Sequence, residues 1–168
     1  YWAKEEYRPA LKHLKKAKKL DPGNPKYYYL EAEIYHGIGN YTLAESAYQD
    51  LFRTLPEDKF SGPHKDLAQV YIDAGRYDKA EKELKRCLEI DPQFPFPHYL
   101  LGHISLSRGN KKQATRYFEV YMKLGGAAHH DEVRQTLRNL QPEIFASWLH
   151  LYSGSEEESS DAGSSSQP

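Results

Sequence analysis

The chain has 168 residues, of which 39% are hydrophobic and 28% charged, a balance typical of a thin, elongated repeat protein that buries only the inner faces of each layer. A formal net charge of −1 gives no reason to expect the whole chain to bind nucleic acid. The single cysteine, Cys87, excludes an internal disulfide, and no apolar run approaches the roughly 20 residues of a membrane-spanning helix.

The first predicted element is a lysine-rich helix within residues 1–24. Leu11, Leu14 and Ala17 recur at helical spacing, so they share one face and leave the lysines of residues 12–19 mostly on the solvated face. Binding to nucleic acid or to an acidic membrane surface would need further basic patches, and the rest of the sequence offers none.

One pattern of residues then recurs over residues 25–58, 59–92 and 93–126. Each copy contains a glycine followed five residues later by an alanine: Gly39 and Ala44, Gly75 and Ala80, Gly109 and Ala114. With Ala10 of the first segment, the alanines are spaced 34, 36 and 34 residues apart. The longer interval falls in the loop around residues 59–62, where insertions are tolerated.

This pattern predicts pairs of antiparallel helices. Small residues before and after each glycine allow the two helices to approach closely, and large residues fill the space between pairs. Glycine ends the first helix in a left-handed conformation. Asn40 and Asn110 are suited to cap the second helix. Prolines at the end of the second helix turn the chain, and Pro25, Pro63 and Pro97 suit the first turn of the next helix.

The 34-residue period, the Gly-x-Tyr-x-x-Ala motif and the final Asp-Pro resemble the tetratricopeptide repeat family from Tyr1 to about Leu124. The resemblance implies an all-α fold, a right-handed α-solenoid of antiparallel helix hairpins. Residues 1–24 would be the end of a first helix plus a second helix, so we expect a fragment that begins inside a repeat. Glu31 stands where the family usually has leucine. Residues 93–126 form a degenerate repeat, in which Lys111 replaces tyrosine.

The sequence after the repeats predicts two capping helices within residues 127–152 and a disordered Ser/Glu-rich tail over residues 153–168. The second of these helices carries aromatic residues at helical spacing, including Phe145 and Trp148. An alternative function for it is to dock into a partner or into the groove of another copy.

In the resembled family the first helices line a concave groove that receives an extended peptide or a helix of a partner. By alignment, twelve residues would line that groove here: Lys26, Tyr29, Glu33, His36, Lys65, Gln69, Ile72, Asp73, Phe96, Tyr99, His103 and Leu106. The aromatic members are of the types that carry binding energy, although they could instead pack within the solenoid. The charges around Lys65 do not match the clamp with which some members bind chaperone C-termini.

No motif for catalysis, phosphate binding or a cofactor occurs in the sequence. His129 and His130 point about 100° apart on a helix, so a solvated helix start is a better interpretation than a metal site. Cys87 aligns with core positions and is predicted to be buried.

We therefore predict a non-catalytic scaffold that binds a protein or peptide partner in the concave groove. One alternative is an architectural spacer within a longer multidomain repeat protein whose activity lies elsewhere. A weaker alternative is self-assembly through the N-terminal half-repeat. The sequence shows no signal or transmembrane segment, which favours the cytoplasm without fixing the compartment, and it leaves the oligomeric state open.

Overall fold

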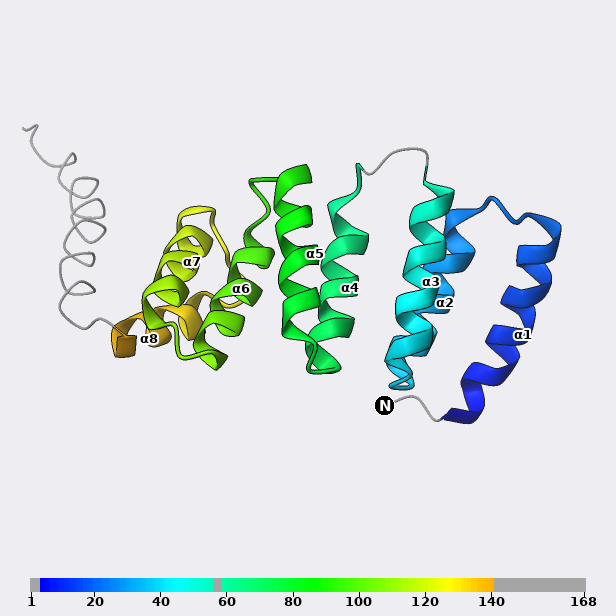
Figure 1. Cartoon of the computed structure of the whole chain (residues 1–168), viewed down its shortest axis with the longest axis horizontal. Coiled ribbons are helices and arrows are strands. Elements are labelled where there is room, and N and C mark those ends of the chain that lie inside the picture. The colour runs from blue at the N-terminus through cyan, green and yellow to red at the C-terminus, as the bar shows by residue number, and fades with distance from the viewer. Residues whose placement is uncertain (1–3, 56–58, 141–168) are drawn as a thin grey trace, which may run out of the picture.

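The computed structural model describes residues 4–55 and 59–140 (Figure 1). All regular elements in these two ranges are α-helices. They are α1 (Lys4–Leu20), α2 (Pro25–Gly37), α3 (Tyr41–Thr54), α4 (Ser61–Asp73), α5 (Tyr77–Ile90), α6 (Pro95–Ser107), α7 (Lys111–Lys123) and α8 (His130–Leu140). The predicted all-α class is confirmed.

The helices form antiparallel hairpins arranged side by side in a row. The most extensive helix–helix packing joins α2 with α3, α4 with α5, and α6 with α7. Between hairpins, α3 contacts α4 and α5 contacts α6, while α1 packs on α2 and α8 on α7. Figure 1 shows this row running from α1 at one end to α8 at the other. The molecule is therefore a solenoid in which each hairpin contacts its neighbours in the row.

Small residues bring the two helices of each hairpin together, as the sequence predicts. Ala32 and Ala44 are fully buried in the first complete hairpin, and Ala68 and Ala80 are fully buried in the second. In the third hairpin, a Cβ atom added at Gly102 would lie 2.5 Å from the nearest ring carbon of Phe118. A methyl group is therefore too large at this crossing.

The hairpin turns also follow the prediction. Gly39, Gly75 and Gly109 have φ angles of 77°, 71° and 74°, in the left-handed region that favours glycine. The side chain of Asn40 then accepts a hydrogen bond from the Leu43 N–H at 3.2 Å. Asn110 caps α7 in the same way. These caps satisfy backbone donors that the first turn of a helix leaves unpaired.

Large side chains fill the space between hairpins. Tyr48, Leu84 and Phe118 are fully buried. Cys87 is also fully buried, and its thiol donates to the Ser61 carbonyl oxygen at 3.3 Å. Burial raises the pKa of the Cys87 thiol to about 11, so the sulfur stays protonated at neutral pH. The prediction of a core cysteine is confirmed.

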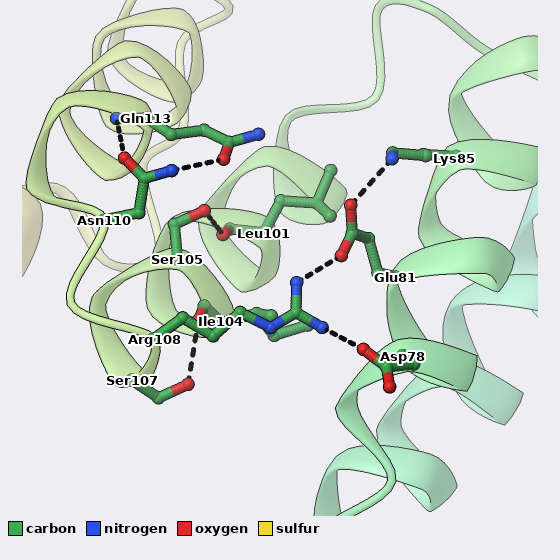
Figure 2. A network of polar contacts seen from close by, with 10 residues as sticks. All are labelled: Asp78, Glu81, Lys85, Leu101, Ile104, Ser105, Ser107, Arg108, Asn110 and Gln113. Atoms are coloured by element: carbon green, nitrogen blue, oxygen red, sulfur yellow. Dashed lines mark hydrogen bonds and ion pairs between the residues drawn. The ribbon is translucent and has the colours of Figure 1, made fainter.

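The second helices carry glutamates that tie each hairpin to the next. Glu45 of α3 accepts hydrogen bonds from Tyr71 at 2.9 Å and from Arg76 and Lys79 at 2.7 Å. At the equivalent position of α5, Glu81 accepts from Arg108 of the following hairpin and lies 2.7 Å from the Lys85 Nζ (Figure 2).

Arg108 completes this second network by donating to Asp78 at 2.5 Å. Glu45 and Glu81 occupy equivalent positions of consecutive hairpins, and each joins its hairpin to the next through charged side chains.

The contact between α1 and α2 is more polar than the contact between α3 and α4. Lys18 Nζ lies 2.5 Å from Glu31 Oε2 and 4.4 Å from the ring centroid of Tyr28. At the equivalent positions of the α3–α4 contact, Phe52 stacks on His64 with ring centroids 4.4 Å apart. Glu31, at the position where the family usually has leucine, is therefore paired with Lys18. In the next repeat, Phe52 stands at the position of Lys18.

Helix α8 covers the last hairpin. Its Val133 and Leu137 are buried and belong to one apolar cluster with Phe118 and Met122 of α7. The second predicted capping helix and the predicted disordered tail lie outside the described residues.

Candidate partner-binding surface

The twelve predicted groove residues lie on the three first helices α2, α4 and α6, and each keeps part of its surface exposed. On α2, positions 26, 29, 33 and 36 follow the spacing that places side chains on one helical face. Ile72 and Leu106 also pack partly against the apolar clusters below them, whereas Lys26 is well exposed.

Direct contacts join α2 to α4 near both ends of this face. The Tyr29 hydroxyl donates to Asp66 Oδ2 at 2.8 Å. His36 Nε2 lies 2.6 Å from Asp73 Oδ2, and the Gln69 amide donates to Asp73 Oδ1 at 2.9 Å. Burial, reinforced by the Asp66 carboxylate, raises the pKa of Tyr29 well above its ordinary value, so its hydroxyl remains a donor.

Glu33 is held from below by the hairpin core. The hydroxyl of buried Tyr48 donates to Glu33 Oε1 at 2.6 Å, and the rings of Tyr48 and Tyr29 meet edge to face with centroids 6.2 Å apart. Burial, followed by the hydrogen bond to Glu33, raises the pKa of Tyr48 far above its ordinary value. The carboxylate is therefore oriented by a phenol that does not ionise at neutral pH.

Between α4 and α6 the surface is a mixture of charge and aromatic rings. Lys65 forms an ion pair with Asp66, and its Nζ lies 6.0 Å from the ring centroid of Phe96, at the outer limit of a cation–π contact. Phe96 in turn stacks on Tyr99 with centroids 5.6 Å apart.

At the end of the row, α8 continues the surface. The Tyr99 hydroxyl lies 3.0 Å from both carboxylate oxygens of Glu132, and its ring stacks on His129 with centroids 4.1 Å apart. Burial and the hydrogen bond to Glu132 raise the pKa of Tyr99 to about 12. His103 Nε2 lies 3.1 Å from Glu132 Oε1, and burial lowers the pKa of His103.

Sequence reasoning missed three residues of this surface: Asp66, His129 and Glu132. His129 does lie at a helix start, as predicted, because α8 begins at His130, but it is only partly solvated, since its ring stacks on Tyr99. Within residues 4–55 and 59–140, no group of three His, Cys, Asp or Glu side chains is arranged to hold a metal ion.

The solenoid and its row of first-helix side chains define a helical-repeat protein. Two tetratricopeptide repeat sequence families match this chain, one over residues 1–58 and one over residues 39–104. The chain belongs to the tetratricopeptide repeat family. No helix in the part of the chain that the structure describes is both long and apolar enough to cross a membrane.

Among curated proteins, tetratricopeptide repeat protein 21A of Mus musculus is 36% identical over 67 residues. That match covers 40% of this chain and 5% of the mouse protein. This chain therefore corresponds to a small part of that relative.

Several solved structures share the fold at low sequence identity. A crystal structure of MamA superposes with a TM-score of 0.71 at 16% identity, over 98% of this chain and 91% of MamA. PilF of Pseudomonas aeruginosa gives a TM-score of 0.69 at 18% identity, over 96% and 71% of the two chains. The Yersinia enterocolitica type III secretion chaperone SycD, solved with a peptide of the translocator YopD, gives 0.64 at 17% identity, over 71% and 93%.

Proposed function

We propose that this chain is a non-catalytic scaffold that binds a peptide or helix of another protein along the face of α2, α4 and α6. The observation that carries the proposal is the row of partly exposed polar and aromatic side chains on three consecutive first helices. The contacts that join neighbouring helices along this face support the proposal, because side chains that are already held in place lose little conformational entropy on binding. The peptide-bound SycD structure adds support by analogy of fold.

The structure affects the choice of test residues. Tyr29 is hydrogen-bonded to Asp66 of α4 and Tyr99 to Glu132 of α8, and Tyr99 also packs near Tyr121. Replacing either with alanine would remove contacts between hairpins as well as a binding group. Lys65 and Phe96 are better probes, because Lys65 pairs with a residue of its own helix and Phe96 has no hydrogen-bonding group, although its ring still packs on Tyr99.

The test is affinity capture of partners from lysate with the Lys65→Ala/Phe96→Ala double variant. We expect it to lose captured partners while its far-UV circular dichroism stays that of the wild type. The matched control is Tyr77→Ala/Lys82→Ala, which removes an exposed aromatic residue and an exposed lysine from α5. Equal capture by both variants and the wild type would contradict binding on the first helices.

A second candidate function is that of a spacer that joins other parts of a longer repeat protein. The small fraction of the mouse relative that this chain matches favours it. In that case, the groove variant would retain every partner captured by the wild type, and binding would depend on segments outside this chain.

A further inference from the structure

A separate apolar surface lies at the edge of the molecule where α2 and α4 begin. A hollow of about 400 Å³ opens between the start of α2, the end of α3 and the start of α4. Apolar side chains dominate its lining, among them Leu30, Leu55, Phe60 and Pro63, and Lys26 is the charged residue among the described residues that line it.

The hollow is open to a ligand because its apolar walls are left uncovered. Leu30 is 51% exposed and Phe60 is 53% exposed, which is unusual for large hydrophobic side chains so close together. The first turns of α2 and α4 contain no acidic residue. Exposed apolar surface of this kind is typical of an interaction site.

A basic surface borders the hollow on the other flank of α2. A second hollow, of about 660 Å³, lies between α1 and α2 and is lined by Lys12, Lys15, Lys18 and Lys19. Lys18 is paired with Glu31, whereas the other three are well exposed. The last of these lysines lie where α1 ends, at the same edge at which α2 begins (Figure 1). A ligand for this edge would combine apolar side chains with negative charge.

The C-terminal part of this chain has that composition and order. Ile144, Phe145, Trp148, Leu149 and Tyr152 recur at helical spacing, and Glu156, Glu157, Glu158 and Asp161 follow with no basic residue after Tyr152. We propose that this segment of one copy binds a second copy. Its aromatic side chains enter the hollow at Leu30 and Phe60, and its acidic residues lie along the lysines of α1.

The hollow belongs to a second copy because the segment cannot reach its own as a helix. Helix α8 lies at the far end of the row from α2, near the edge opposite to the one at which α2 and α4 begin (Figure 1). A helix over residues 142–152 is about 16 Å long at 1.5 Å per residue. The path back must cover the length of α2, about 20 Å for its 13 residues, and at least two helix–helix separations of about 10 Å each.

This contact joins two different surfaces, so it is heterologous and can add copies head to tail. We expect the mass of the purified full-length chain in sedimentation velocity to rise with concentration.

Leu30→Glu and Trp148→Glu should each weaken association at least about tenfold. Leu43→Glu, at an exposed leucine of α3 outside the hollow, is the control and should associate as the wild type does. If Leu30→Glu misfolds, Phe60→Ser tests the same hollow from the connecting loop.

A mixing experiment distinguishes binding of the C-terminal segment in the hollow of a second copy from association through any other surface. The Leu30→Glu copy keeps an intact C-terminal segment, and the Trp148→Glu copy keeps an intact hollow. Neither should associate alone, yet an equimolar mixture should form a dimer and nothing larger, because one competent pair of surfaces remains. The proposal would be overturned if the wild type stayed monomeric at all concentrations, or if the mixture formed no dimer. The hollow would then bind a different protein, or the C-terminal segment would pack on its own copy.

Charge exchange tests the second half of the contact. Glu156→Lys/Glu157→Lys/Glu158→Lys and Lys12→Glu/Lys15→Glu/Lys19→Glu should each weaken association, and mixing the two variants should restore it. Absence of restoration would overturn the pairing of acidic residues with α1. All of these measurements use the purified chain alone, so their outcome is independent of partner capture by the face of α2, α4 and α6.

Discussion

The absence of one methyl group at Gly102 sets the distance between α6 and α7. The Phe118 ring lies over this glycine and is itself fully buried, so it has no free space into which it can move. The equivalent positions of the earlier hairpins, Ala32 and Ala68, carry a methyl group and are fully buried. The position of the Phe118 ring, and not the repeat pattern, therefore requires glycine at residue 102.

We predict that Gly102→Ala lowers the free energy of unfolding by about 1–3 kcal/mol, because the added methyl group overpacks the hairpin. Urea denaturation followed by circular dichroism measures this. The control is Gly62→Ala in α4, where an added Cβ has no atom within 4 Å. Alanine there should leave stability unchanged or raise it by up to about 1 kcal/mol. Equal effects of the two substitutions would refute the packing argument.

Individual side-chain partners were the least predictable part of the candidate surface. Alignment with the family placed Tyr29, His36 and Tyr99 on the first helices, but it did not pair them with residues of the next helix. The partners lie 37 residues away for Tyr29 and His36 and 33 residues away for Tyr99. The offset depends on loop length and on the angle between hairpins, and neither is encoded in the local pattern.

The elements themselves were largely predictable, because their signals are local. Left-handed glycines, asparagine caps and small residues at the crossings all act within one hairpin, so spacing in the sequence is enough to predict them. The polar contact between α1 and α2 was not predicted. Glu31 appeared as a departure from the family pattern, and only the geometry shows that Lys18 compensates for it.

The contact between α5 and α6 depends on ionised Glu81. Hydrogen bonds from Lys85 and Arg108 lower the pKa of Glu81, so the folded state favours the carboxylate. Because the folded pKa lies below the unfolded value of about 4.3, this contribution to stability is complete above that value. It is lost as the pH falls through the folded pKa, when both states bind the proton.

We therefore predict that Glu81→Gln is less stable than the wild type at pH 7 and that the difference shrinks as the pH falls below about 4. Thermal unfolding at a series of pH values between 7 and 3 measures it. A difference that stays constant over this range would show that the network of Figure 2 contributes through packing and not through charge.

At the scale of the whole molecule, stability should vary along the row. Each hairpin contacts its neighbours in the row, so local opening does not require the whole solenoid to unfold. Within residues 7–20, α1 buries one side chain, that of Leu14, against a partly polar neighbour. In contrast, α4 buries five residues and α6 buries six.

Hydrogen exchange measured by mass spectrometry should therefore show fast exchange in α1 and the strongest protection in α4, α6 and α7, of which α7 also buries five residues. The expected order follows from buried side chains and not from helix length, because α1 is the longest described helix, with 17 residues. Uniform protection from α1 to α6 would indicate a single cooperative unit and contradict this order.

The two contacts between α2 and α4, at Tyr29–Asp66 and at His36–Asp73, have a mechanical consequence. They are seven residues apart on α2, which is about 10 Å along its axis. A single contact would act as a pivot, but two separated contacts resist rotation of one hairpin against the next. This part of the solenoid is thus braced against torsion, so twisting of the row should concentrate outside the pair of α2 and α4.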